Sequence, residues 1–295
     1  MRTMYYVVYG FLWLLSLLPL RLLYVLSDAC YGILFYIIKY RRDIVMNNLK
    51  IAFPEKTEEE RYRIAKKFYH NLVDTFIETI KMISASRSYL EKRFKGNWEV
   101  VNALKESGRK VSMHLGHNFN WEWGNAVATK EFNIPFVGAY MPIKNKTFDK
   151  LFYNLRSRYG TLLVRATNMR EDMLKYRNTQ YTIGLVCDQN PGTAASGIWF
   201  NFFGKPAPFL NKPVKAAIAN KCAIVFAFIH KKKRGSYEVI FTLVEEASEN
   251  STDVELTRKF VHYMEDVIRR YPDMWLWSHR RWKHQWKPEY GPVLD

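Results

Sequence analysis

Apolar residues dominate the first forty positions of the chain, in two runs at 4–20 and 22–38. Only four charged residues occur among them, namely Arg2, Arg21, Asp28 and Lys39. A clean transmembrane helix needs ~20 uninterrupted apolar residues, and Pro19 with Arg21 breaks the stretch near its middle. A single tilted span, a helical hairpin in one leaflet, an amphipathic helix in the interface and two buried core helices therefore all stay open.

Basic residues follow the apolar region directly, as Lys39, Arg41, Arg42 and Lys50. Positive residues beside a membrane segment favour the cytoplasmic side and attract anionic headgroups. A cleaved secretory signal is not expected, because no small-residue cleavage site ends the first apolar run. We therefore expect residues 1–40 to be an N-terminal hydrophobic membrane anchor and residues 41–295 to form one domain on the cytoplasmic face.

Periodic patterns in that domain predict alternating helices and strands. Thr57 and Glu60 have capping-box spacing, and apolar residues then recur every three or four positions to Ile83. Further patterns predict strands at 110–115, 134–140, 181–186, 223–229 and 237–244, and helices at 120–130, 148–158, 169–177, 212–220 and 254–270. The alternation predicts an α/β fold with a mixed, largely parallel central sheet flanked by helices.

The charge of the chain indicates an anionic partner. Among 295 residues, 45 Lys and Arg against 28 Asp and Glu give a formal charge of +17. Nucleic acid, an acidic protein and anionic lipid all fit this sign. No helix-turn-helix, RNA-recognition or zinc-finger signature occurs, so we do not expect nucleic acid as the partner. Cys30, Cys187 and Cys222 are too scattered for a disulfide framework or a metal cluster, which favours a reducing compartment.

The sharpest candidate for chemistry is the segment LGHNFNWEWG at 115–124. It follows a predicted strand and opens a predicted helix, where open α/β sheets place their ligand sites. If His117 lies in the loop and Glu122 in the first helical turn, the carboxylate can bind one ring nitrogen. The other nitrogen is then free to take a proton from a substrate hydroxyl. A His and a Glu five residues apart also occur by coincidence, so the general-base pair is a hypothesis.

Other common chemistries lack their residues in this sequence. It has no His-Glu-x-x-His, no cysteine pair with zinc spacing, no Gly-x-Ser-x-Gly elbow and no phosphate-binding Gly-rich loop with a Lys. We therefore expect neither a metal nor a resident cofactor.

His117 and Glu122 in this setting resemble the His-x4-Asp/Glu motif of glycerolipid-type acyltransferases. The aromatic-rich form resembles that of the lipid A late (secondary) acyltransferase family. Further segments resemble that family in the same order along the chain, namely Tyr40–Leu49 with Phe53–Glu55, Asn154–Gly160, Asp188–Gly192 and Trp275–Lys283. The likeness covers nearly the whole chain.

The resemblance implies an acyltransferase that moves a fatty acyl group from a thioester, usually that of acyl carrier protein, to a hydroxyl of a lipid A precursor. The implied place is the cytoplasmic face of the bacterial inner membrane. His117 would deprotonate the hydroxyl and Glu122 would orient His117. A thioester is a good electrophile, so direct attack needs no acyl-enzyme. Acyl-acyl carrier protein or acyl-CoA would be the co-substrate, and an acidic carrier with a phosphorylated glycolipid would account for the basic charge.

The resemblance also names candidate binding residues. Arg156 and Arg158 lie about 200° apart on a helix, so one is expected to face the site, and the family segment favours Arg156. A solvated surface is the alternative for both. Asp188 and Gln189 follow a predicted strand, where Asp188 is either a functional carboxylate or a turn former.

Two more sets complete the candidates. Asn118 and Asn120 lie at the predicted helix start, where backbone amides could hold an oxyanion. Arg156 is the alternative donor to the oxyanion. Arg280 and Arg281 are candidates for headgroup contacts, with edge packing of the C-terminal segment as the alternative.

The lipid acceptor stays open at this point. Enzymes with similar motifs acylate mannosylated phosphoinositides or amino-acid lipids, so the resemblance fixes the reaction type better than the acceptor. A non-catalytic basic membrane scaffold is the alternative from another class, and it would not need His117 and Glu122.

Overall fold

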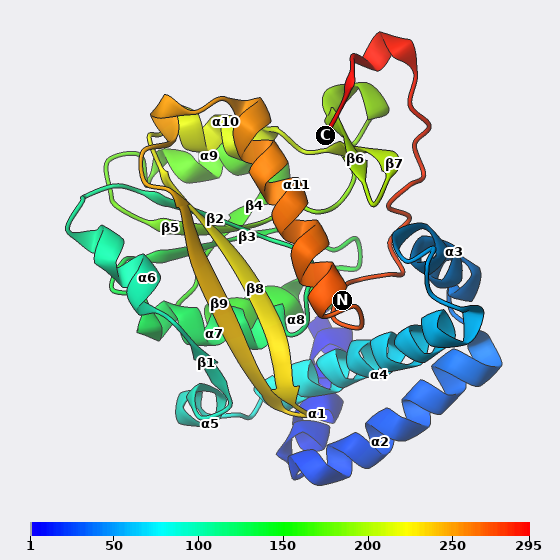
Figure 1. Cartoon of the computed structure of the whole chain (residues 1–295). Helices are drawn as coiled ribbons and strands as arrows, with labels where there is room; N and C mark the ends of the chain where they lie inside the picture. The colour runs from blue at the N-terminus through cyan, green and yellow to red at the C-terminus, as the bar shows by residue number, and fades with distance from the viewer. Residues whose placement is uncertain (1) are drawn as a thin grey trace.

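A seven-stranded sheet forms the centre of the computed structural model, which describes residues 2–295 (Figure 1). Its strand order is β1-β9-β8-β2-β5-β3-β4. The strands are β1 (Phe94–Gly96), β2 (Val111–Leu115), β3 (Phe136–Tyr140), β4 (Leu162–Arg165), β5 (Thr182–Val186), β8 (Ala223–Lys233) and β9 (Ser236–Glu245). Neighbouring strands are parallel except for the antiparallel pair β8 and β9. The predicted mixed, largely parallel sheet is confirmed.

Helices cover both faces of the sheet (Figure 1). One face carries α5 (Arg87–Glu91), α6 (Glu99–Asn102), α7 (Trp121–Glu131) and α8 (Lys146–Ser157), and the other carries α9 (Met169–Leu174), α10 (Lys212–Ala219) and α11 (Asp253–Arg270). The alternation of side chains along β8 explains this division. Val225 packs in the cluster that holds Trp123 of α7, whereas the next residue, Phe226, packs in the cluster that holds Phe260 of α11.

The long helix α4 (Glu58–Met82) begins at the capping box expected from the sequence. Glu60 N donates to Thr57 Oγ1 at 3.2 Å, and Thr57 N donates back to Glu60 Oε2 at 2.7 Å. α3 (Arg42–Ala52) precedes α4 and packs against it. On the side away from the sheet, α4 carries α1 (Arg2–Leu17) and α2 (Leu20–Gly32) (Figure 1).

The two N-terminal helices turn apolar side chains outward. Val7, Phe11 and Leu14 of α1 are each more than 60% exposed. Helical structure continues from α2 through Ile33–Ile38, and Leu20–Ile38 is apolar and long enough to cross a membrane by length and composition alone. One side of this segment is buried in the protein, through Leu23, Ser27 and Phe35. The segment is therefore a candidate membrane anchor that also packs on the body.

A second, three-stranded sheet was not predicted. It has the order β10-β6-β7, with β6 (Ile198–Phe202), β7 (Lys205–Phe209) and β10 (Val293–Leu294). β7 was not expected from the sequence because it contains Pro206 and Pro208, and proline disfavours a strand. Proline is tolerated in β7 because this strand lies at the edge of its sheet. The turn between β6 and β7 is Phe203–Gly204, where both residues have positive φ, as a two-residue hairpin turn of type I′ requires. β4 was also missed, because it is only four residues long and lies at the edge of the main sheet, where Val164 is its one buried residue.

Candidate active site

The site forms where two neighbouring parallel strands end. Leu115 of β2 pairs with Val186 of β5, so the loops that follow both strands leave the same edge of the sheet. Parallel sheets place ligand sites at this edge. The loop after β2 carries His117, and the loop after β5 carries Asp188 and Gln189.

Asp188 is the hydrogen-bond partner of His117. Its Oδ1 lies 2.6 Å from Nδ1 of the His117 ring, and its Oδ2 accepts from the main-chain N–H of His117 at 2.9 Å. Trp275 Nε1 donates to the same Oδ2 at 2.7 Å. With Nδ1–H donating to Asp188, Nε2 carries the ring's lone pair, and the amide of Gln189 lies 3.2 Å from it. His117 is thus arranged to accept a proton at Nε2.

These contacts keep Asp188 ionised although it is buried. Burial by itself raises the pKa of the carboxyl group, which is 2% exposed. Attraction to His117 and the hydrogen bonds from His117 and Trp275 outweigh burial, so the pKa of Asp188 is lowered to about 2. The carboxylate can therefore stabilise a positive charge on His117.

Glu122 has a different partner from the one expected. Arg156 of α8 binds its carboxylate with Nη2–Oε1 at 2.6 Å and Nε–Oε2 at 3.0 Å, and Trp121 Nε1 donates to Oε1 at 3.2 Å. The prediction that Glu122 orients His117 is corrected here, because Asp188 takes Nδ1 while Glu122, in the first turn of α7, pairs with α8. Burial lowers the pKa of Arg156, but Glu122 outweighs it and the pKa is raised.

A cavity of about 760 Å³ opens beside these side chains, between the sheet and α7. Its polar lining includes His117, Glu122, Arg156 and Gln189. Its lining is otherwise mainly apolar and includes Phe94, Trp98, Met113, Leu115, Ala227 and Phe241. Glycines make room for it: a Cβ at Gly124 would lie 3.0 Å from the ring of Phe94. The cavity has the size and the largely apolar lining of a site for a mainly hydrocarbon ligand.

The two candidate asparagines are buried and do not line this cavity. Asn118 Nδ2 donates to Met274 O at 3.3 Å, and the Asn118 main-chain N–H donates to Gly116 O at 2.8 Å. Asn120 is fully buried, and its Nδ2 donates to Glu78 Oε2 at 2.8 Å. Their side chains therefore serve the protein's own structure.

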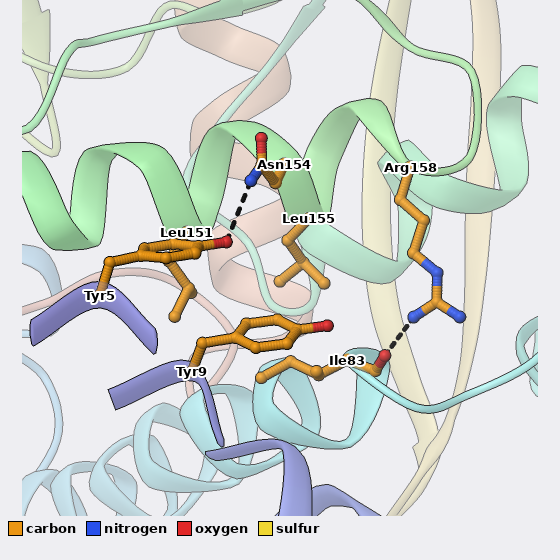
Figure 2. A pocket seen from close by; sticks show the side chains of 7 residues that line it. All are labelled: Tyr5, Tyr9, Ile83, Leu151, Asn154, Leu155 and Arg158. Atoms are coloured by element: carbon orange, nitrogen blue, oxygen red, sulfur yellow. Dashed lines mark hydrogen bonds between the residues drawn. The ribbon is translucent and has the colours of Figure 1, made fainter. Parts of the chain in front are cut away.

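Arg158 points away from His117. Its guanidinium donates to the carbonyl oxygens of Met82 and Ile83. It lines a separate cavity of about 190 Å³ between α1 and α8, beside Tyr5 and Tyr9 (Figure 2). The expectation that only one of Arg156 and Arg158 faces the His117 site agrees with this placement.

The two C-terminal arginines differ from each other. Arg280 is exposed, whereas Arg281 is fully buried and donates to Asn190 Oδ1 at 2.8 Å. The Arg281 guanidinium also lies over the ring of Phe209, 4.1 Å from its centre, and burial lowers the pKa of Arg281 to about 9. The prediction that Arg281 contacts a headgroup is therefore wrong. Arg281 instead supports the loop after β5 from inside the protein.

Trp275 is the site residue that sequence reasoning missed. It lies in the C-terminal segment that was recognised by its aromatic and basic residues, but its contact with Asp188 comes from the folding of that segment over the loop after β2. Asn118 and Trp275 form an isolated antiparallel bridge there. Within residues 2–295, no group of three His, Cys, Asp or Glu side chains is arranged to hold a metal ion.

Comparison with known proteins identifies a family. The family model described as bacterial lipid A biosynthesis acyltransferase matches residues 1–284. The chain is 24% identical over 293 residues to the lipid A biosynthesis lauroyltransferase of Escherichia coli K12, covering 96% of this chain and 92% of that protein. It is 23% identical over 291 residues to the palmitoleoyltransferase of the same organism, covering 93% and 89%. A lipid A biosynthesis acyltransferase of Haemophilus influenzae is 23% identical over 274 residues, covering 90% and 83%.

Proposed function

The chain belongs to the bacterial lipid A biosynthesis acyltransferase family and is an acyltransferase, and we propose that it moves a fatty acyl chain from an acyl carrier protein thioester to a hydroxyl of a lipid A precursor. The reaction is a secondary acylation, in which the acceptor is the 3-hydroxyl of a lipid-borne hydroxyacyl chain. The observation that carries this proposal is the His117–Asp188 pair at an apolar cavity.

His117 acts as the general base. The acceptor hydroxyl takes the place of the Gln189 amide at Nε2 of His117 and gives its proton to that nitrogen. The hydroxyl oxygen attacks the thioester carbonyl, a carbon–oxygen bond forms, and the carbon–sulfur bond breaks. The proton then passes from Nε2 to the leaving thiolate. Asp188 stabilises the imidazolium while it exists, as a buried carboxylate does in other His-based sites.

Arg156 supplies positive charge to the attacked carbonyl. It lines the same cavity as His117, and Glu122 holds its guanidinium by three hydrogen bonds. A cation fixed before the reaction stabilises a developing oxyanion without reorganisation. Glu122 therefore acts through Arg156 in this proposal.

The basic surface serves the anionic substrates. Exposed Lys144 and Lys146 lie before and at the start of α8, and exposed Lys212 lines the cavity. Phosphates of the glycolipid and the acidic carrier protein are suitable partners, with Arg280 as a further headgroup contact. Residues 1–40 anchor the enzyme, and the domain 41–295 works at the cytoplasmic face of the inner membrane.

Mass spectrometry of lipid A tests the proposal. Cells that lack the gene should make lipid A that is lighter by one acyl chain, and the missing mass gives the chain length. The wild-type gene should restore the mass, whereas a His117→Ala gene expressed at the same level should not. Unchanged lipid A in the deletion strain contradicts the proposed acceptor. Assays of purified enzyme with acyl carrier protein and CoA thioesters side by side then identify the donor.

A further inference from the structure

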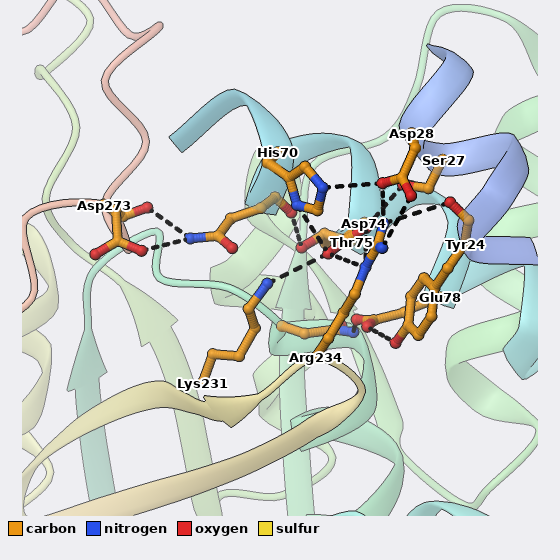
Figure 3. Close-up of polar contacts among 12 residues, drawn as sticks. Tyr24, Ser27, Asp28, His70, Asp74, Thr75, Glu78, Lys231, Arg234 and Asp273 are labelled. Carbon is orange, nitrogen blue, oxygen red and sulfur yellow. Dashed lines mark hydrogen bonds and ion pairs between the residues drawn. The ribbon is translucent and has the colours of Figure 1, made fainter. Parts of the chain in front are cut away.

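A cluster of buried polar side chains joins α2, α4 and the β8–β9 hairpin (Figure 3). At its centre are two fully buried carboxylates of α4, Asp74 and Glu78, which lie about one helical turn apart. Asp74 is bound by cations, with Arg234 Nη2 at 2.7 Å and Lys231 Nζ at 3.3 Å, and by the hydroxyl of Ser27 at 2.7 Å. The polar contacts of Asp74 thus come from α2, α4 and the β8–β9 hairpin.

Glu78 is bound by neutral donors only. Tyr24 of α2 donates to Oε1 at 2.6 Å, and Tyr237 of β9 donates to Oε2 at 2.6 Å. The third donor is Asn120 Nδ2, at 2.8 Å from Oε2. Burial raises the pKa of Glu78, while the hydrogen bonds from Tyr237, Tyr24 and Asn120 oppose that rise. Of these three donors, Asn120 is the one that leads to the active site.

Asn120 is the N-cap of α7. Its Oδ1 accepts from the main-chain N–H of Trp123 at 3.3 Å, so the two ends of one amide join Glu78 to the first turn of the helix. Trp123 Nε1 also donates to the main-chain oxygen of Glu78 at 3.0 Å. Glu78 therefore holds residues on both sides of Glu122, and Asn120 lies three residues after His117.

We propose that Glu78 is a positioning residue for acyl transfer, which fixes through Asn120 the loop that carries His117 and the helical turn that carries Glu122. Misplacement of catalytic groups by about 1 Å costs about 100-fold in rate, so a loose cap is enough to slow the reaction. A residue that only stabilised the fold would lower the melting temperature and leave kcat of the folded protein unchanged. The inference rests on the proposed function, because kcat is measured on acyl transfer.

A swap of the two hydrogen-bonding groups tests this role. Asn120→Asp places a second carboxylate against Glu78, and two buried carboxylates repel each other. We expect kcat to fall at least about tenfold, with KM for the lipid within about twofold of wild type, because the loss is in positioning. In the double variant E78Q/N120D, the glutamine amide donates to the carboxylate introduced at position 120, which still caps Trp123. The double variant should recover most of the lost kcat.

Hydrogen exchange gives a readout that does not depend on activity. Amides of residues 121–124 should exchange faster in Asn120→Asp and return towards wild-type rates in the double variant. Asp74→Asn is the matched control, since it changes the neighbouring buried carboxylate of α4: it should lower the melting temperature but leave kcat and the exchange of 121–124 near wild type. If Asn120→Asp does not fold, Asn120→Ser keeps a side-chain cap and removes only the bond to Glu78, and the same fall in kcat is expected.

Two results would overturn the inference. One is a double variant that is as slow and as fast-exchanging as Asn120→Asp, and the other is an Asp74→Asn variant that loses as much kcat as the Asn120 variants. A wild-type enzyme without acyl transfer contradicts the proposed function instead, while restored exchange in the double variant would still support the link from Glu78 to α7.

Discussion

Asp188 binds His117 at two points, with one carboxylate oxygen 2.6 Å from the ring Nδ1 and the other 2.9 Å from the main-chain N. The ring and the loop that carries it are thus tied to one buried group. Rotation of the ring would break one of these contacts, and a shift of the loop would break the other. The two-point contact therefore fixes both which nitrogen carries the proton and where the lone pair of Nε2 points.

Asp188→Asn should remove this control while keeping the shape of the side chain. The asparagine amide offers one acceptor oxygen to three donors, two of them from His117 and one from Trp275, so the tautomer with the lone pair on Nε2 loses its advantage. We expect kcat to fall by about 10³ to 10⁴-fold, as in other sites where an aspartate that orients a histidine is replaced by asparagine. Steady-state assays should show KM for the lipid nearly unchanged. Asp172→Asn, which affects a pair with Arg165 on the surface, is the control and should keep wild-type kcat.

Asp188 also sets part of the acid stability of the protein. Its pKa in the folded state, about 2, lies below the ordinary aspartate pKa of about 3.9. The carboxylate therefore contributes stability that is fully present above about pH 4 and is lost as the pH falls from about 4 to about 2, worth roughly 2 kcal/mol. Urea unfolding at pH 5 and at pH 3 should show a smaller loss of unfolding free energy in Asp188→Asn than in wild type. Equal losses in both would contradict the assigned pKa.

Glu122 and Arg156 should behave as one unit. Glu122→Gln leaves Arg156 without its carboxylate partner, and Arg156→Gln leaves the buried Glu122 carboxylate without its cation. Each change should lower kcat/KM by about 10- to 100-fold. Because both changes remove the same ion pair, the double variant should be little worse than Arg156→Gln alone. A double-mutant cycle on kcat/KM measures this coupling, with Arg165→Gln as an exposed arginine control. Strictly additive losses would show that Glu122 acts without Arg156, as the His117–Glu122 pair expected from the sequence requires.

Local signals explain why much of the fold was predictable. The capping-box spacing at Thr57 marked the start of one long helix, and the periodic pattern at 254–270 marked another; the structure contains both, as α4 and α11. Short, mainly apolar segments located β2, β3 and β5. The separation of Arg156 from Arg158 followed from helical geometry alone. These features depend on residues that are close in sequence.

The partner of His117 could not be predicted in the same way. Asp188 reaches His117 because β5 lies next to β2, although β3 and β4 come between them in the chain. Strand order is set by packing of the whole sheet, and no local pattern in the sequence states it. Glu122 had a local geometric argument for contact with His117, but Arg156 from α8 competes for the same carboxylate. The sequence therefore singled out several residues that line one cavity, but it could not predict which of them pair.

The apolar cavity should set the length of the acyl chain. Gly124→Leu adds a side chain towards Phe94 and Ile229, where even a Cβ is close at 3.0 and 3.2 Å, so the enzyme should prefer shorter donors. Trp98→Ala removes an aromatic ring from the lining and should favour longer ones. Each methylene excluded from the cavity costs about 0.8 kcal/mol, or roughly fourfold in KM.

Competition assays with mixed acyl thioesters measure the shift, and an unchanged product distribution in both variants would place the acyl chain elsewhere. A short donor that does not reach Phe94 should keep its wild-type kcat and serves as the internal control.

The apolar outer face of α1 should bind the enzyme to membranes. Phe11 and Leu14 are 67% and 62% exposed, so Phe11→Glu with Leu14→Glu changes the outer face without disturbing the core. Each inserted side chain contributes about 2 kcal/mol, and glutamate is also repelled by anionic lipid. We therefore expect partition onto anionic vesicles to fall by at least about 100-fold, with an unchanged melting temperature.

Wild type should stay bound in high salt, because apolar burial is not screened. Leu174→Glu, at an exposed position of α9 on the other face of the sheet, should bind like wild type. Equal vesicle binding by all three proteins would show that α1 does not hold the enzyme at the membrane.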